Sequence, residues 1–194
     1  MSRFLVFLTA VAMLAVSAVA EVQTWQIDPN HTAAQFSVSH MGISTVRGAF
    51  TKVSGSAQYD PSDPGKTSVE ATIDAASVDT RVSMRDDDLR SANYFDVAKY
   101  PTITFKSKSV QAAGEGKLKI TGDLTIHGVT KEAVLDVEGP SAPVTDPRGN
   151  THVGASASTK INRKDFGVGG SSSMVGEEIT ITIDVELVQP AAKK

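Results

Sequence analysis

The sequence predicts an all-β protein, either an antiparallel sandwich or an up-and-down barrel. Apolar and polar residues alternate along about eight segments, and a period of two places the apolar side chains on one face of a strand. Short Gly-, Pro- and Asp-rich turns separate these segments, which favours hairpins between antiparallel strands. The polar second face and the few aromatic residues argue against an outer-membrane barrel, whose apolar face would point outward.

The strands are expected at eight places along the chain. The alternation is clearest in the last of them, where Ile179, Ile181 and Ile183 fall on one face and Thr180 and Thr182 on the other. The expected strands are residues 33–40, 46–59, 68–75, 102–110, 117–126, 131–137, 153–161 and 178–187.

One segment departs from the strand pattern and predicts a short helix over residues 84–93. Ser83 and Asp86 have the spacing of a capping box, and Asp86 and Arg90 have the i,i+4 order that favours an ion pair. In an all-β chain, such a segment often closes one end of a barrel. The Gly- and Ser-rich residues 167–173 are expected to form a flexible loop.

The first twenty residues predict a secretory signal peptide that is cleaved after Ala20. Their apolar run, residues 4–16, is about 13 residues long, whereas a helix needs roughly 20 residues to span a bilayer, so an uncleaved anchor is disfavoured. The absence of cysteine excludes a lipoprotein anchor. We therefore expect a signal peptide at 1–20 and one domain at 21–194, which lies in the periplasm without a stable membrane anchor.

The composition excludes several classes of chemistry. Without cysteine there are no disulfides, thiol nucleophiles or Cys-ligated metal sites. A formal net charge of -3 argues against nucleic-acid binding, which needs a basic patch. No G-x-S-x-G, H-E-x-x-H or P-loop motif occurs. His31, His40, His127 and His152 are far apart in the sequence, so neither a metal site nor a catalytic residue is predicted.

The predicted inner faces combine bulky apolar residues with many alanines. Ala57, Ala71, Ala75, Ala155 and Ala157 stand among the larger side chains. An eight-stranded barrel has room either for its own side chains or for one small ligand. The residues alone leave both alternatives open, a fully packed core and an elongated apolar cavity for a lipid chain.

Charged residues are concentrated around the predicted helix, at one expected mouth of the barrel. Arginines there could hold an anionic head group through paired hydrogen bonds, or they could belong to a solvated helix face with local ion pairs. Arg163 has two similar interpretations, a ligand contact or a buried strut that pairs with an acid. The head-group candidates are His31, His40, Arg81, Arg85 and Arg163.

Several sequence blocks resemble the YceI-like family of secreted, lipocalin-like proteins. They are WQIDPNH at 25–31, FSVSH at 36–40, VRGAF at 46–50, RDDDLRSANYFD at 85–96, YPTITF at 100–105, GDLTIHGVTK at 122–131 and INRKDFG at 161–167. The resemblance implies an extended, lipocalin-like, eight-stranded antiparallel barrel with a helical segment near one opening. It also implies binding of long polyisoprenoids or related amphiphiles, including isoprenoid quinones, with no established enzymatic activity.

On this basis the sequence predicts a non-enzymatic periplasmic binding or carrier protein for a long-chain amphiphile. No cofactor is expected beyond an isoprenoid quinone or polyprenyl lipid bound as ligand. The alternatives are an enzyme that acts on such a lipid through His31 and His40, and a protein-binding, stress-related module; a monomer and a homodimer are both left open. The predicted cavity residues are Phe36, Val38, Phe50, Ile73, Leu89, Tyr94, Phe95, Ile103, Phe105, Ile120, Leu124 and Ile126.

Two positions depart from the family's pattern. Asp88 stands where the family often has a histidine in its helix block, and His127 stands where an arginine is common before Gly-Val-Thr. If either family side chain touches the head group, the head-group preference of this chain would differ.

Overall fold

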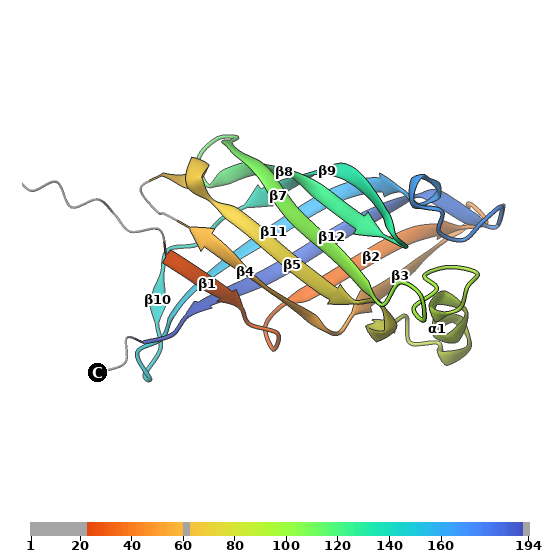
Figure 1. Ribbon diagram of the computed structural model, residues 1–194, viewed down its shortest axis with the longest axis horizontal. Helices are drawn as coiled ribbons and strands as arrows, with labels where there is room; N and C mark the ends of the chain where they lie inside the picture. Colours follow the sequence, from red (N-terminus) through yellow and green to blue (C-terminus); the bar gives the residue numbers. More distant parts are fainter. Residues whose placement is uncertain (1–22, 60–62, 192–194) are drawn as a thin grey trace, which may run out of the picture.

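The fold is a closed antiparallel β-barrel that is much longer than it is wide (Figure 1). The computed structural model describes residues 23–59 and 63–191, so the expected signal peptide at 1–20 lies outside the described residues. The strands are β1 (Gln23–Ile27), β2 (Ala33–His40), β3 (Ser44–Phe50), β4 (Val53–Tyr59), β5 (Ser68–Asp74), β6 (Val78–Asp79), β7 (Thr102–Ala112), β8 (Lys117–Ile126), β9 (Val129–Glu138), β10 (Val144–Thr145), β11 (Thr151–Asn162) and β12 (Val175–Gln189). Between them lie the helix α1 (Ser83–Arg90) and the 3-10 turns Pro64–Lys66, Ala75–Ser77 and Arg163–Phe166.

Eight strands form the barrel wall in the order of the sequence. The first wall strand consists of β1 and β2, which pair with successive stretches of β12. The second consists of β3 and β4, which pair with β2 and β1, respectively. From β4, each strand pairs with the next through β5, β7, β8, β9 and β11. The barrel closes because β12 lies between β11 and the β1–β2 strand. The predicted eight-stranded up-and-down barrel is therefore confirmed.

The structure interrupts one predicted strand. The expected strand 46–59 breaks at Thr51 and Lys52, whose backbone N–H groups donate to the carbonyl and hydroxyl oxygens of Ser77. These bonds take the place of a strand ladder. The chain bends there, between β3 and β4.

The first wall strand begins earlier than predicted, with β1, and contains an outward turn. Ile27 lies opposite Leu187, and Ala33 lies opposite Asp184. The first strand therefore advances by six residues over a stretch in which β12 advances by three. The surplus residues form the turn at 28–32, which leaves the sheet and returns to it.

The fully buried apolar residues of the described chain fall into three clusters. At the end that carries α1, here called the helix end, the walls meet in one large cluster that includes Phe50, Val78 and Phe166. Toward the end where β1 begins and β12 ends, here called the terminal end, two separate clusters contain Val53 and Val137. Ile73 packs against the first and second clusters, and Phe105 packs against the first and third, so the clusters are linked along the wall.

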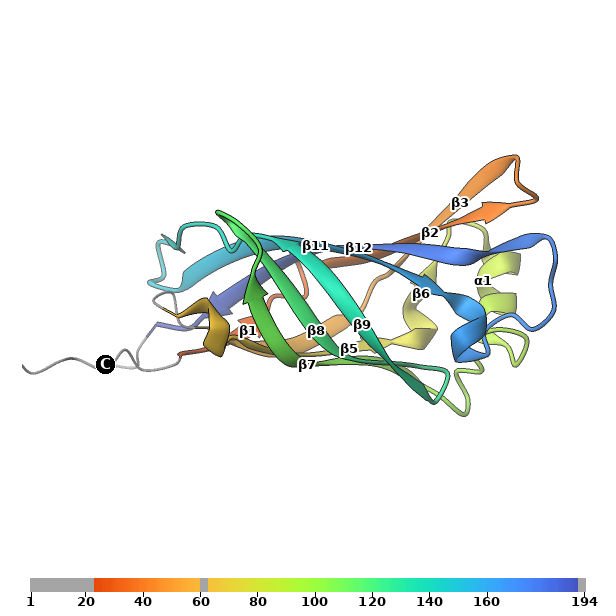
Figure 2. The same ribbon diagram turned by 90° about the horizontal axis from the view of Figure 1, so that it is seen from above.

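Side chains of α1 attach the helix to the segment before it, residues 76–80. The buried carboxylate of Asp86 accepts hydrogen bonds from the backbone N–H and the hydroxyl of Thr80. Arg85 donates to the hydroxyl and carbonyl oxygens of Thr80 at 2.8 and 3.0 Å. Arg90 donates to two carbonyl oxygens of residues 76–78 at 2.8 and 2.7 Å. The helix is thereby held across the helix end, as both views show (Figures 1 and 2).

The helix is shorter than predicted, Ser83–Arg90 instead of 84–93, and both predicted local interactions of Asp86 are wrong. The helix has no side-chain cap, and Arg90 pairs with the aspartate that follows Asp86. The reason is that Asp86 reaches Thr80, where a buried hydrogen bond stabilises more than an exposed ion pair would. No helix among the described residues is long and apolar enough to cross a membrane.

Arg163 is a buried strut of the helix end and is only 3% exposed. Its guanidinium donates four hydrogen bonds of 2.8–2.9 Å to backbone carbonyls instead of pairing with an acid. The acceptors are the carbonyl oxygens of Val168, Ser172, Val175 and Gly176. The segment 167–173, expected as a flexible loop, is fastened to the barrel by these bonds.

Replacing Arg163 by methionine would leave these buried carbonyls without their donor. A buried polar group that loses its partner costs about 1–3 kcal/mol, so we expect Arg163→Met to lower the free energy of unfolding by at least about 3 kcal/mol. Urea denaturation followed by circular dichroism measures this loss. The neighbouring Lys164→Met, which removes an exposed ion pair with Glu177, should cost less than about 1 kcal/mol. Equally small losses in both variants would contradict the role of Arg163.

Candidate functional site

The barrel encloses a cavity of about 270 Å³ whose wall is almost entirely apolar. It reaches from Ile27 and Leu187, toward the terminal end, to Leu89 and Val168 at the helix end. Every apolar residue predicted from the sequence lies in this wall. They are Phe36, Val38, Phe50, Ile73, Leu89, Tyr94, Phe95, Ile103, Phe105, Ile120, Leu124 and Ile126. The sequence left open whether the interior is a packed core or an apolar cavity, and the structure has the cavity.

Short side chains keep the interior open. Ala57 and Ala71 line the cavity from β4 and β5, and Ala155 and Ala157 line it from β11. Ala75 is buried in the helix-end cluster instead. Because an alanine side chain extends only one carbon from the backbone, the walls do not reach each other at these positions.

Two glycines give phenylalanine rings room to pack over the sheet. A Cβ atom added at Gly48 would lie 2.5 Å from Cζ of Phe36, and one added at Gly122 would lie 2.5 Å from Cζ of Phe105. Any side chain at these positions would push the rings away from the wall. Gly122, which interrupts the apolar alternation in the sequence, therefore helps to set the width of the cavity.

Aromatic rings and the helix segment form the inner surface of the helix end. The ring centroid of Phe50 lies 5.8 Å from that of Phe36 and 5.6 Å from that of Phe95, distances typical of tilted and edge-to-face pairs. Leu89 of α1 and Tyr94 also line the cavity here. The wall at this end therefore comes partly from outside the strands.

Two buried polar atoms toward the terminal end have no hydrogen-bond partner among the described residues. Thr67 lines the cavity, and its hydroxyl oxygen is one of them; the indole Nε1 of Trp25 is the other. Trp25 lies opposite Ala57, which lies opposite Val69, two positions from Thr67. Buried polar atoms are normally hydrogen-bonded, so the Thr67 hydroxyl, which lines the cavity, is available to a polar atom of an occupant.

The structure brings four of the five head-group candidates to the helix end. Arg163 lies in the cavity wall, but its guanidinium already donates to backbone carbonyls. Arg85 is bound to Thr80, Arg81 is exposed, and His40 lies half-buried at the end of β2. Contact of these four residues with a head group stays a prediction. In the structure, Arg85 and Arg163 donate their hydrogen bonds to the protein itself.

His31 lies away from these four, before the start of β2. The eight residues of β2 separate His31 from His40, which amounts to about 30 Å along a strand. The two histidines therefore do not meet. An enzyme that uses both on one bound lipid has no geometric support.

The two departures from the family pattern have local partners. The rings of His127 and Tyr100 are 4.6 Å apart between centroids. The carboxylate of Asp88 accepts a hydrogen bond of 2.7 Å from the side-chain amide of Asn93. Neither His127 nor Asp88 lines the cavity.

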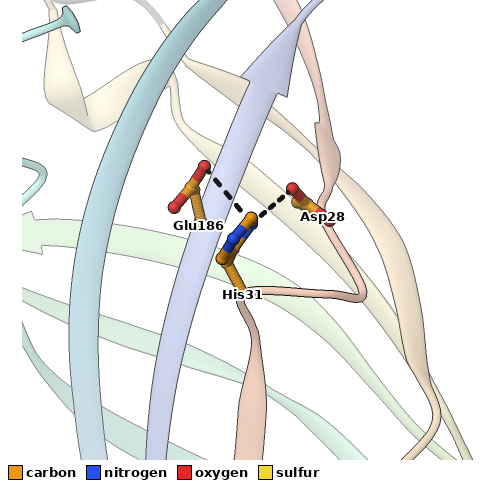
Figure 3. A group of neighbouring side chains, drawn as sticks. All are labelled: Asp28, His31 and Glu186. Carbon is orange, nitrogen blue, oxygen red and sulfur yellow. Dashed lines mark hydrogen bonds and ion pairs between the residues drawn. The ribbon is translucent and has the colours of Figure 1, made fainter.

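His31 belongs to a group of titratable side chains on the outer surface (Figure 3). Its Nδ1 lies 2.8 Å from Oδ2 of Asp28 and 3.9 Å from Oε1 of Glu186. Nδ1 of His152 lies 2.8 Å from the same Oε1, and its Nε2 lies 3.3 Å from Oδ2 of Asp146. Glu186 points outward because its two neighbours in β12 line the cavity.

Hydrogen bonds within this group shift pKa values in opposite directions. The bond to Asp28 raises the pKa of His31, and the bond to the neighbouring glutamate raises that of His152. The bond from His31 lowers the pKa of Asp28, and the bond from Asn150 lowers that of Asp146 to about 2. Ionised carboxylates thus lie beside imidazoles that bind a proton more tightly than usual.

The sequence did not predict this group because its members come from distant segments. The turn at 28–32, the end of β12 and the segment from Asp146 to His152 meet only when the barrel closes. The available signal was the outward position of Glu186 in a strand whose inner face is apolar. The list of predicted cavity residues also omits the inner face of β12, such as Ile181, although its alternation was the clearest in the chain.

Residues 25–187 match the family model described as the YceI-like domain. The chain is 36% identical to protein YceI of Escherichia coli O157:H7 over 191 residues, which cover 97% of this chain and 99% of that protein. The crystal structure of the YceI protein of Campylobacter jejuni, 34% identical, superposes with a TM-score of 0.70 and covers 78% of this chain and 89% of its own. A polyisoprenoid binding domain from Saccharophagus degradans shares the fold at 16% identity, with a TM-score of 0.64 over 88% of this chain and 100% of that domain.

An NMR titration of the histidine rings tests the bond between His152 and Glu186. Since this bond raises the pKa of His152 above the ordinary 6.5, its stabilising effect should be complete below pH 6.5 and should disappear as the pH rises through the raised pKa. In Glu186→Gln the pKa of His152 should move back toward 6.5. A His152 curve that is the same in both proteins would show that the bond is absent.

Proposed function

Because the chain belongs to the YceI-like family, we propose that it binds the chain of a long amphiphile in its barrel and carries it through the periplasm. The ligand class is a polyisoprenoid, an isoprenoid quinone or a similar lipid. The observation that carries the proposal is the apolar cavity along the barrel. The shared fold of a polyisoprenoid binding domain supports the ligand class.

The cavity wall suits a hydrocarbon chain. Each CH₂ group that moves from water into apolar surroundings contributes roughly 0.8 kcal/mol, so a long isoprenoid tail binds firmly without polar contacts. Affinity then comes from the tail, and several tail types should be accepted. Selectivity depends on the few polar atoms at the wall, such as the Thr67 hydroxyl.

The chemistry of the wall favours holding a ligand over transforming it. The ionisable side chains among its lining residues are Tyr59, Tyr94 and Arg163. A side-chain nucleophile is weak until a neighbouring base or a lowered pKa activates it, and Thr67 has no hydrogen-bond partner among the described residues. We therefore propose a non-enzymatic role.

Exposed apolar side chains at the helix end support a carrier that meets membranes. The turn between β2 and β3 and the helix α1 lie at this same end (Figure 2), and the backbone N–H of Met41 donates to the carbonyl of Met174. The large exposed apolar residues of this end are Met41, Ile43, Val82, Met84 and Met174. A lipid carrier must contact a bilayer, and these side chains can enter its interface. The expected signal peptide supports the periplasm as the compartment.

Filling the cavity tests the binding proposal. Ala157→Phe places a phenyl group in the space of several CH₂ groups, at about 0.8 kcal/mol each, and should weaken lipid binding at least about tenfold. Mass spectrometry of lipids extracted from gently purified protein, followed by titration with an isoprenoid quinone, measures the effect.

The matched control is Ser158→Phe, one position along β11 and exposed. It should bind the quinone like the wild type. Circular dichroism confirms that both variants fold. Wild-type protein that binds no isoprenoid, or a folded Ala157→Phe variant that binds as well as the wild type, would overturn the proposal.

Vesicle transfer tests the carrier role. In the double variant Ile43→Asp, Met84→Asp, two exposed apolar side chains of the helix end become charged. Because charges resist entry into a bilayer, we expect the rate of quinone transfer between vesicles to fall at least about tenfold, with unchanged affinity for quinone in detergent solution. The control Val144→Asp changes an exposed apolar residue on β10 and should transfer normally. Equal transfer rates in all three proteins would contradict a membrane contact at the helix end.

A further inference from the structure

We propose that Asp28, His31 and Glu186 form a binding site for a divalent transition metal ion of the Zn²⁺ class on the outer surface of the barrel. The site is independent of the cavity, because Asp28 and His31 lie on the turn at 28–32 and Glu186 lies on the outward face of β12 (Figure 3). Its three ligand atoms, one from each residue, lie within 4.8 Å of one another.

The distances suit a small metal ion. Zn²⁺ binds imidazole nitrogen and carboxylate oxygen at about 2.0–2.2 Å in tetrahedral geometry, which separates the ligand atoms by about 3.4 Å. Nδ1 of His31 lies 2.8 Å from Oδ2 of Asp28 and 3.9 Å from Oε1 of Glu186. These two distances lie on either side of the required one, and no two of the three ligand atoms are more than 4.8 Å apart. Rotation of the two carboxylates about their side-chain bonds would bring their oxygens around a metal ion bound to Nδ1.

The backbone holds the ligands in place before metal arrives. Oδ1 of Asp28 accepts a hydrogen bond of 2.8 Å from the backbone N–H of Asn30, which directs Oδ2 toward His31. The backbone N–H of Asp28 donates to the carbonyl of Glu186 at 2.9 Å. The backbone N–H of Glu186 donates to the hydroxyl of Thr32 at 3.3 Å. Two hydrogen bonds therefore join the turn to β12 at the site, and a third orders the turn itself.

Behind the ligands lies an outer layer of the kind that metal sites use. Nδ1 of His152 is 2.8 Å from the Oε1 atom of Glu186, and its Nε2 is 3.3 Å from Asp146. Asp146 is held in turn by the side-chain amide of Asn150 at 2.9 Å. This chain orients the Glu186 carboxylate from the side opposite to His31.

Charge and access favour a divalent cation with some affinity for nitrogen. Two carboxylates and a neutral imidazole carry a charge of about -2, which a divalent ion neutralises. An imidazole ligand favours Zn²⁺, Ni²⁺ or Cu²⁺ over Mg²⁺ and Ca²⁺, which prefer oxygen. The His31 side chain is 64% exposed, and those of Asp28 and Glu186 are 16% and 32% exposed. The site is thus open to solvent, and water can fill the remaining coordination position.

Isothermal titration calorimetry of the tag-free, chelator-treated full chain with ZnCl₂ tests the proposal. We expect one equivalent of Zn²⁺ to bind to the wild type. His31→Ala and Glu186→Gln should each weaken binding at least about 100-fold, and His152→Ala should weaken it about tenfold, as for an outer-layer residue. His40→Ala, a histidine substitution at the far end of β2, should bind Zn²⁺ like the wild type.

Two outcomes would overturn the proposal. One is a wild-type protein that shows no Zn²⁺ binding by calorimetry at millimolar metal. The other is binding that both His31→Ala and Glu186→Gln retain with wild-type affinity, since the metal would then bind elsewhere. Circular dichroism checks that the variants fold. Lipid extracted from His31→Ala should match that of the wild type, so that failure of the metal site and failure of the lipid proposal are separate results.

Discussion

Closure of the barrel by β12 is the constraint on which the rest of the structure depends. Its residues pair with β11 along one edge and with β2 and β1 along the other, so the sheet has no free edge along the wall. Because side chains alternate along a strand, this register sets both faces at once. Val185 faces the cavity, and Glu186 faces outward beside His31 and His152. A shift of one residue would exchange the two faces.

The two ends of the barrel differ in how closely their side chains pack. Protein interiors are stabilised by close packing, and an open cavity gives up part of that stabilisation. The helix end compensates with the large apolar cluster around Phe50, with the buried bonds of Asp86 to Thr80 and with the carbonyl acceptors of Arg163. The terminal half has two smaller apolar clusters, and the cavity runs through both halves. The chain achieves this without any cysteine.

The sequence predicted the parts of the structure that depend on local periodicity. Alternation identified all eight wall strands and the inward position of residues such as Phe105 and Leu124. It did not show β1, which has only five residues, nor the break between β3 and β4, which depends on hydrogen bonds to a distant turn. The sequence also did not predict the contacts of side chains whose partners lie in distant parts of the chain. Arg163 was expected to pair with an acid or a ligand and binds carbonyls, because only the fold brings residues 168–176 around it. His31 was assigned to a mouth near His40, although the strand predicted at 33–40 already separates the two histidines, and β2 places them at its opposite ends.

The apolar cavity also links occupancy to stability. If the barrel binds a lipid as proposed, the ligand fills apolar space that the side chains of the wall leave open, and anything that binds only the folded state shifts the folding equilibrium toward it. Filled molecules should then open less often than empty ones and survive proteases longer.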